Sequence, residues 1–141
     1  MAGIRRVEDI EAYQLAVALR RRVLGIVASG RIRNDWKFID QIRDSVRGAS
    51  RNISEGFSRF APGEFSQFLS YAKASLDETR NHIEDGFESG YFTAEERDEL
   101  LALLGRTIGA IRGFMRYLAS PAAKRWYAQR RRTTSAEPEE P

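Results

Sequence analysis

Apolar residues recur along this chain at the three- and four-residue spacing of amphipathic helices, and no alternating apolar pattern of strand length appears. Four segments carry this spacing, at about residues 7–29, 35–60, 62–90 and 93–120. The second segment is the most regular, because its apolar positions step by 3, 4, 3 and 4 residues: Ile39, Ile42, Val46, Ala49 and Ile53. The pattern therefore predicts an all-α protein built as an up-down-up-down antiparallel four-helix bundle.

Residues that favour helix ends stand where this pattern begins. Asp35 is a good N-cap for the second segment, and Pro62 suits the first helical position of the third. Thr93, with Glu96 three residues later, predicts a capping box at the start of the fourth. The apolar face predicted for the first segment consists of five residues: Ile10, Tyr13, Val17, Leu24 and Val27.

The chain divides at Pro121, which is predicted to end the fourth helix. Residues 1–120 are expected to form the bundle, and residues 121–141 a C-terminal basic extension. Within the extension, residues 122–132 predict a short helix, and the remainder, which ends in EPEEP, predicts a disordered acidic tail.

Charge is distributed unevenly along the chain. The net charge of the 141 residues is +3, and 20 of the 23 basic residues are arginines. Residues 1–60 carry a surplus of 5 positive charges, residues 61–120 a surplus of 4 negative charges, and residues 121–141 a surplus of 2 positive charges. Such polarisation favours an electrostatic partner or self-assembly.

Several protein classes are excluded by composition. The absence of cysteine excludes disulfide scaffolds, thiolate metal sites and cysteine nucleophiles. No apolar run exceeds five residues, so neither a membrane span nor a signal segment is predicted, and we expect a cytoplasmic protein without membrane contact.

Signatures of enzymes are missing from the sequence. The sequence contains neither of the glycine-rich phosphate-binding motifs, G-x-x-x-x-G-K-[ST] and G-x-G-x-x-G. It also lacks the nucleophile elbow G-x-S-x-G. Di-iron bundles need a Glu-x-x-His motif on two helices, whereas this chain has one histidine, His82, with Thr79 three residues before it. We therefore expect no catalytic residue, no metal and no cofactor.

The centre of the chain carries a family resemblance. The segment QIRDSVRGASRNISEGFSRFAPGEFSQFLSYAKASLDE resembles the four-helix bundle family that includes the protein encoded by the intervening sequence of 23S ribosomal RNA genes. That family is related to the accessory variability proteins of diversity-generating retroelements. Two clusters of residues match the family pattern: Gln41, Ile42, Arg43, Asn52, Ile53, Glu55, Gly56 and Arg59, followed by Glu64, Phe65, Phe68, Leu69, Ala72, Ser75, Leu76 and Glu78.

The resemblance covers about residues 10–118 and implies several properties. The fold would be a four-helix bundle that forms a homo-oligomer, commonly a pentamer, with a positively charged surface linked to nucleic acid and without an established activity. This chain departs from the pattern at Gly48, where the family has serine, and at Ala61, where the family has a serine that would cap the third helix. Loss of that cap predicts a weaker helix start, by about 1 kcal/mol.

Arginines spaced four residues apart form a row on the second predicted helix: Arg43, Arg47 and Arg51. Such a row could bind successive phosphates. The alternative is pairing within the helix, because Asp40, Asp44 and Glu55 stand three or four residues from these arginines.

The C-terminal extension adds five further candidates for nucleic-acid binding: Lys124, Arg125, Arg130, Arg131 and Arg132. Trp126 and Tyr127 lie among them, where they could stack on bases or dock the extension on the bundle.

Glycines spaced four residues apart form a second row, on the fourth predicted helix: Gly105, Gly109 and Gly113. Each glycine costs a helix interior about 1 kcal/mol relative to alanine, so the row calls for a compensating contact. We expect it to pack against another subunit; an exposed face without a role is the alternative.

Five polar residues near the junction of the second and third helices form the last candidate set: Asn52, Glu55, Arg59, Ser75 and Glu78. No nucleophile or metal triad completes an active site among them, so a buried or intersubunit structural network is predicted.

Two functions follow from these features. The first is a non-enzymatic, homo-oligomeric bundle that binds nucleic acid, with structured RNA favoured, through arginine-rich surfaces. The alternative is a scaffold that recruits a partner protein such as a reverse transcriptase, without direct contact with nucleic acid.

Overall fold

The computed structural model describes residues 3–135. For residues 133–135 only the backbone is described. The chain is all-α, as predicted, and the described residues include no strand. Residues 3–135 form five α-helices, one more than the four long ones of the sequence pattern, because the C-terminal extension is also helical. After a short 3-10 turn, η1 (Val7–Asp9), the helices are α1 (Glu11–Ala28), α2 (Trp36–Phe57), α3 (Pro62–Glu88), α4 (Ala94–Leu118) and α5 (Pro121–Ser135).

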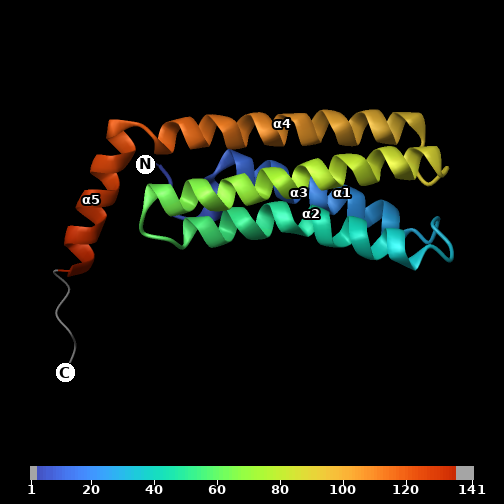
Figure 1. Cartoon of the computed structure of the whole chain (residues 1–141), viewed down its shortest axis with the longest axis horizontal. Coiled ribbons are helices and arrows are strands. Elements are labelled where there is room, and N and C mark those ends of the chain that lie inside the picture. Colours follow the sequence, from blue (N-terminus) through green and yellow to red (C-terminus); the bar gives the residue numbers. More distant parts are fainter. Residues whose placement is uncertain (1–2, 136–141) are drawn as a thin grey trace, which may run out of the picture.

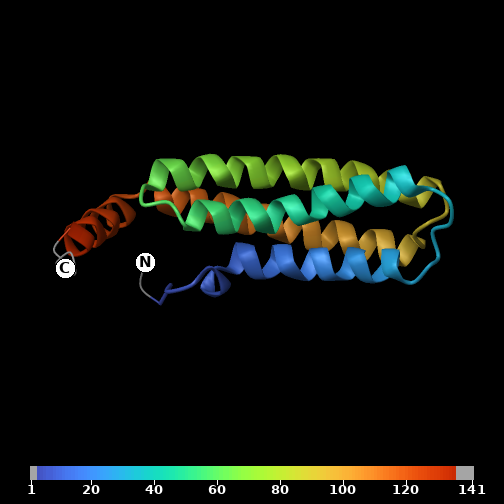
Figure 2. The same cartoon turned by 90° about the horizontal axis from the view of Figure 1, so that it is seen from below.

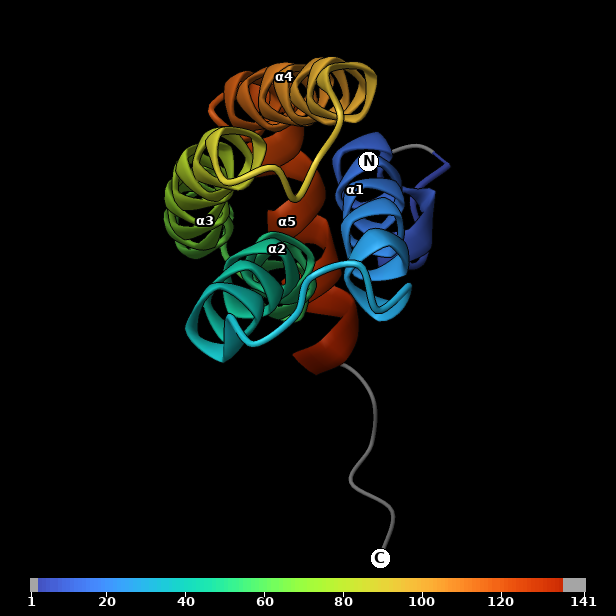
Figure 3. The ribbon, with the colours of Figure 1, turned by 90° about the vertical axis from the view of Figure 1, so that its right-hand side faces the viewer.

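The four long helices lie side by side around a shared core. Each contacts two of the others, in the order α1, α2, α3, α4 and back to α1. The connections from α1 to α2 and from α3 to α4 lie at one end of the molecule, and the connection from α2 to α3 lies at the other (Figures 1 and 2). Viewed along the long axis, α5 crosses this second end of the four helices (Figure 3). There α5 contacts α3 and α4.

The helix ends follow the sequence signals. The Asp35 carboxylate accepts a hydrogen bond from the Phe38 backbone N–H at 3.2 Å, which confirms it as the N-cap of α2. Thr93 and Glu96 form the predicted reciprocal capping box at the start of α4. Ala61 stands at the N-cap of α3 in an extended conformation and gives no side-chain cap, so the first turn of α3 lacks one hydrogen-bond acceptor.

The core confirms the stripe predicted for α2, whose five apolar positions are all buried. The face predicted for α1 is wrong in part. Ile10 and Val27 are buried as predicted, but Tyr13, Val17 and Leu24 are only half-buried. The rest of the buried side is formed by neighbouring positions: Ala12, Ala16, Leu19, Val23 and Ile26. The two alanines allow close approach of α1 to the other helices, which leaves the bulkier residues on its flank.

The extension is longer than predicted, since α5 continues to Ser135 rather than ending near residue 132. Its Tyr127 ring is 2% exposed and belongs to the main core cluster, so this aromatic residue docks the extension, as one of the two alternatives held. Burial raises the pKa of the Tyr127 hydroxyl. The predicted acidic tail lies, in residues 136–141, outside the described part of the chain.

Candidate nucleic-acid interface

The arginine row lies along one flank of α2, beside the buried stripe. Arg47 and Arg51 are exposed, and Arg43 is half-buried. The predicted pairs within the helix do not form: among residues 3–135 these three arginines take part in no ion pair. Glu55 pairs instead with Arg59, at 2.7 Å. The positive charge of the row is therefore not neutralised by the carboxylates of its own helix.

A groove of about 580 Å³ runs beside this row, between α1 and α2. We call it the arginine groove. Eight residues line it, three from α1 and five from α2: Tyr13, Arg20, Leu24, Arg47, Ser50, Arg51, Ser54 and Glu55. Three of the eight are arginines, against a single carboxylate that already has an arginine partner. The groove therefore offers an anion more donors than competing acceptors.

Arg20 is the residue of this site that the sequence patterns did not single out. Its Nη1 donates a hydrogen bond to the Ser50 hydroxyl at 2.9 Å, and Ser50 is only 2% exposed. The Ser50 hydroxyl lies 3.3 Å from the Arg47 carbonyl oxygen, which fixes it on α2. One donor holds the guanidinium in place while its other N–H groups stay available, because a guanidinium has five.

Gly48 lies close to α3. A Cβ at this position would lie 2.5 Å from the Ser75 hydroxyl oxygen and 3.1 Å from the Ser75 Cβ, whereas the Nη2 atom of Arg51 would be in ordinary contact at 3.6 Å. A serine at position 48, as in the family pattern, would require the Ser75 side chain to shift. The glycine thus permits close approach of α2 to α3.

The basic residues of α5 form a separate surface at the end of the molecule. Five of its positions expose a positive charge: Lys124, Arg125, Arg130, Arg131 and Arg132. The Arg130 guanidinium lies over the ring of Trp126 at 5.0 Å and faces the ring of Phe60 at 5.6 Å. Phe60, in the connection between α2 and α3, is 54% exposed. The half-buried Trp126 and the exposed Phe60 therefore lie beside an arginine here, whereas Tyr127 is buried; stacking of bases on this surface stays a prediction.

The predicted polar set is not assembled into one buried network within the chain. Glu55 and Arg59 form their ion pair at the surface, with side chains 50% and 44% exposed. The Asn52 amide donates to the Gly48 carbonyl at 2.8 Å, and Ser75 packs against Gly48. Glu78 is exposed and has no hydrogen bond or ion pair among the described residues. The intersubunit form of this network stays a prediction.

A buried polar pair that the sequence analysis missed joins α2 to α3. The hydroxyls of Ser45 and Thr79 lie 3.0 Å apart, both within the core. Thr79 also donates to the Ser75 carbonyl at 2.8 Å. These hydrogen bonds therefore satisfy the small polar residues where α2 packs against α3.

The glycine row lies on the outer side of α4. Gly105 and Gly109 are exposed, and a Cβ at either position would meet no atom within 4 Å. Gly113 is half-buried and, with Gly109, lines a groove of about 480 Å³ between the start of α1 and α4. Packing inside one chain therefore does not require glycine at positions 105 and 109, and a contact with another subunit stays a prediction.

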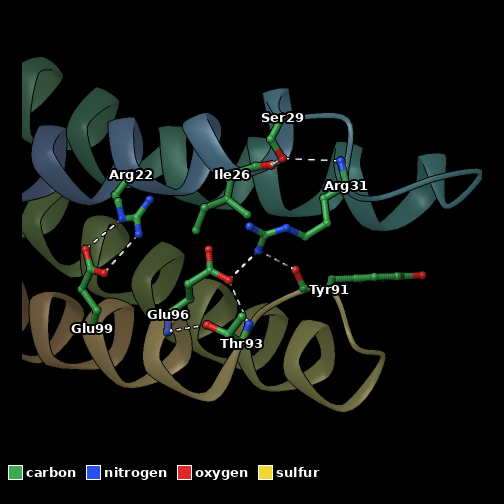
Figure 4. A network of polar contacts seen from close by, with 8 residues as sticks. All are labelled: Arg22, Ile26, Ser29, Arg31, Tyr91, Thr93, Glu96 and Glu99. Atoms are coloured by element: carbon green, nitrogen blue, oxygen red, sulfur yellow. Dashed lines mark hydrogen bonds and ion pairs between the residues drawn. The ribbon is translucent and has the colours of Figure 1, made fainter.

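At the end of the molecule opposite α5, arginines are used differently. Figure 4 shows Arg31, in the connection after α1, paired with Glu96 of the capping box, and Arg22 bound to Glu99 through two hydrogen bonds of 2.8 and 3.2 Å. The N–H of Thr93 and the Arg31 guanidinium lower the pKa of Glu96, and Arg22 lowers the pKa of Glu99. The Arg22 pair joins α1 to α4 and the Arg31 pair joins the α1–α2 connection to α4, whereas the arginines of the groove have no carboxylate partner in the part of the chain that the structure describes.

Two further findings bear on function. Among the described residues no group of histidine and carboxylate side chains is arranged to hold a metal ion. None of the helices in that part of the chain has the length and apolar character to cross a membrane.

The sequence profile of the 23S rRNA-intervening sequence protein matches residues 8–113, which include the arginine row and the whole groove. No curated protein matches the chain.

Proposed function

The chain belongs to the family of the 23S rRNA-intervening sequence protein, and from this premise we propose that it binds nucleic acid without catalysing a reaction, with structured RNA as the favoured ligand. The observation that carries the proposal is a group of four arginines along α1 and α2, none of which has a carboxylate partner among the described residues: Arg20, Arg43, Arg47 and Arg51.

Electrostatics supports this reading. Arginine presents a planar fork that binds phosphate through two parallel hydrogen bonds. Each phosphate contact releases condensed counterions from the nucleic acid, which drives binding and makes it depend on salt. The basic face of α5 would extend the contact at one end of the molecule.

The architecture completes the proposal. We propose that the four long helices act as an antiparallel bundle and that copies of it assemble into a homo-oligomer in the cytoplasm, with a pentamer favoured. Gly105, Gly109 and Gly113 would form part of the contact between subunits. Assembly would repeat the arginine groove around the oligomer, so that one RNA could meet several grooves at once and bind with higher avidity.

Fluorescence anisotropy with a labelled RNA hairpin tests the proposal. We expect saturable binding that weakens steeply as salt is raised from about 50 to about 200 mM. Replacing Arg47 and Arg51 with glutamine should weaken binding. The matched variant, with Lys124 and Arg125 replaced by glutamine, removes the same charge from α5 and separates the two surfaces. Failure of the wild-type protein to bind the hairpin even at low salt would contradict the proposal.

One observation favours the alternative, a scaffold for a partner protein such as a reverse transcriptase. Trp36, at the start of α2, is 69% exposed. Tryptophan is enriched among the residues that dominate protein interfaces. If the protein binds no RNA, loss of a partner on replacing Trp36 with alanine would support the scaffold function.

A further inference from the structure

Tyr13 stands at the boundary between the arginine groove and a second, smaller groove. The second groove has a volume of about 370 Å³ and is also lined by Tyr13 and Arg20. Tyr13 is half-buried, takes part in no ring contact and makes no side-chain hydrogen bond among the described residues. Its side chain packs in part against the core, and the part that stays exposed lines the arginine groove together with Arg20, Arg47 and Arg51.

We propose that the arginine groove binds one unpaired nucleotide of a single-stranded RNA segment, with the base against the Tyr13 ring and the adjoining phosphate held by Arg20 and Arg47. This inference rests on the proposed function and narrows it from structured RNA in general to an unpaired loop or end. Bases in a duplex are stacked on each other, so only an unpaired base can lay its face on an aromatic side chain.

The dimensions of the site fit a ligand of this size. The groove volume of about 580 Å³ lies within the range of roughly 300–1,000 Å³ that holds small ligands. Tyr13 and Arg20 are seven residues apart on α1, which is two helical turns, or about 10 Å along its axis. A base against the Tyr13 ring and its neighbouring phosphate at the end of the Arg20 side chain would be separated by a distance of this order.

The lining of the groove contains some groups that suit a base and others that suit a phosphate. Ser54 and Glu55 lie on the same face of α2 as the arginine row and offer a hydroxyl and a carboxylate that could pair with the edge of a base. Arg20, held by Ser50, is positioned before the ligand arrives, so little side-chain entropy is lost when it binds a phosphate. The groove thus combines an aromatic face, base-edge partners and phosphate donors.

The test compares the affinities for two fluorescein-labelled RNAs, a single strand of about ten uridines and a blunt duplex of similar charge. Tyr13→Leu is expected to weaken single-strand binding by about fivefold to a hundredfold, the usual effect of losing one stacked base. Tyr13→Phe keeps the ring and should bind as the wild type does. The affinity for the duplex should change less than about twofold. Tyr71→Leu, at a 48% exposed tyrosine on α3, is the matched control and should change neither affinity.

The outcomes separate the two proposals. If the wild type binds neither RNA, the proposed function fails and this inference fails with it. If the wild type binds RNA but Tyr13→Leu has no effect, or weakens single strand and duplex equally, only the inference is overturned. Photocrosslinking of wild-type protein to single-stranded RNA carrying 5-iodouridine needs no variant. A crosslink mapped to Tyr13 supports the site, and crosslinks confined to other residues overturn it.

Discussion

Replacing Gly86 with alanine tests how tightly the end of α3 packs against the connection to α4. An ideal Cβ at this position would lie 2.5 and 2.7 Å from two ring atoms of Phe92 and 2.9 Å from the tip of the Phe38 ring. Both rings are buried, at 3% and 8% exposure, and their centroids are 6.1 Å apart. Neither ring can therefore move away without disturbing the core.

The expected change combines two opposing effects. Overpacking a core by a methyl group costs about 1–3 kcal/mol, and the higher helix propensity of alanine returns up to about 1 kcal/mol. With contacts as short as these the upper part of the steric range applies, so the free energy of unfolding should fall by about 1–2 kcal/mol. For a chain of this length about 1 kcal/mol corresponds to roughly 3 °C, which predicts a drop in Tm of about 3–6 °C.

Gly25→Ala is the matched control, because it makes the same chemical change within α1, at a position where a Cβ would meet no atom of another element within 4 Å. It should raise the free energy of unfolding by up to about 1 kcal/mol. Thermal unfolding followed by circular dichroism measures both variants. If Gly86→Ala were as stable as Gly25→Ala, the packing around Phe92 would not be as close as described.

Three further predictions concern the helix start, the Glu96 ion pair and the glycine row. Ala61→Ser should raise the free energy of unfolding in urea by about 1 kcal/mol, since it supplies the missing cap of α3; no gain would show that the first turn is already satisfied. The pKa of Glu96 is lowered in the folded state, so its contribution to stability is present above the ordinary carboxyl pKa of about 4 and is lost as pH falls through the lowered value. Glu96→Gln should therefore lose less stability than the wild type between pH 7 and pH 3, and equal losses would contradict this role. Gly109→Leu should reduce the mass measured by light scattering if the glycine row joins subunits, whereas an unchanged mass would refute that contact.

The sequence was most informative where a local rule determines the outcome. The Asp35 cap, the Thr93 capping box and the α2 stripe depend on neighbours within one turn or one helix, and all three were predicted. The face of α1 was harder to predict, because Val17 and Leu24 are as apolar as the residues that are buried. Which side of α1 faces inward depends on how closely its alanines let the other helices approach.

In the candidate site, too, features set within one helix were predictable and contacts between helices were not. The arginine row was visible from its four-residue spacing, but the absence of its ion pairs was not, because Glu55 has suitable partners on both sides and pairs with Arg59. The sequence could not show that Arg20 lies beside the row, since its contact with Ser50 bridges residues 30 positions apart. One signal was available: Tyr13, Arg20 and Leu24 share a helical face, with spacings of seven and four residues.

The central claim is that arginines of the α1–α2 groove contact phosphates, and the salt dependence of RNA binding tests it most directly. We would plot the logarithm of the association constant for a labelled RNA hairpin against the logarithm of salt concentration. A double variant, Arg20→Gln with Arg47→Gln, should weaken binding and reduce the magnitude of the slope by about 1, because these two arginines hold one phosphate and about one counterion contribution is lost with each phosphate contact.

A second double variant, Arg106→Gln with Arg112→Gln, removes the same charge from exposed positions on α4. The account predicts that its slope stays close to that of the wild type. Equal slopes for the wild type and the groove variant, or equal losses in the two double variants, would contradict binding through the arginine groove.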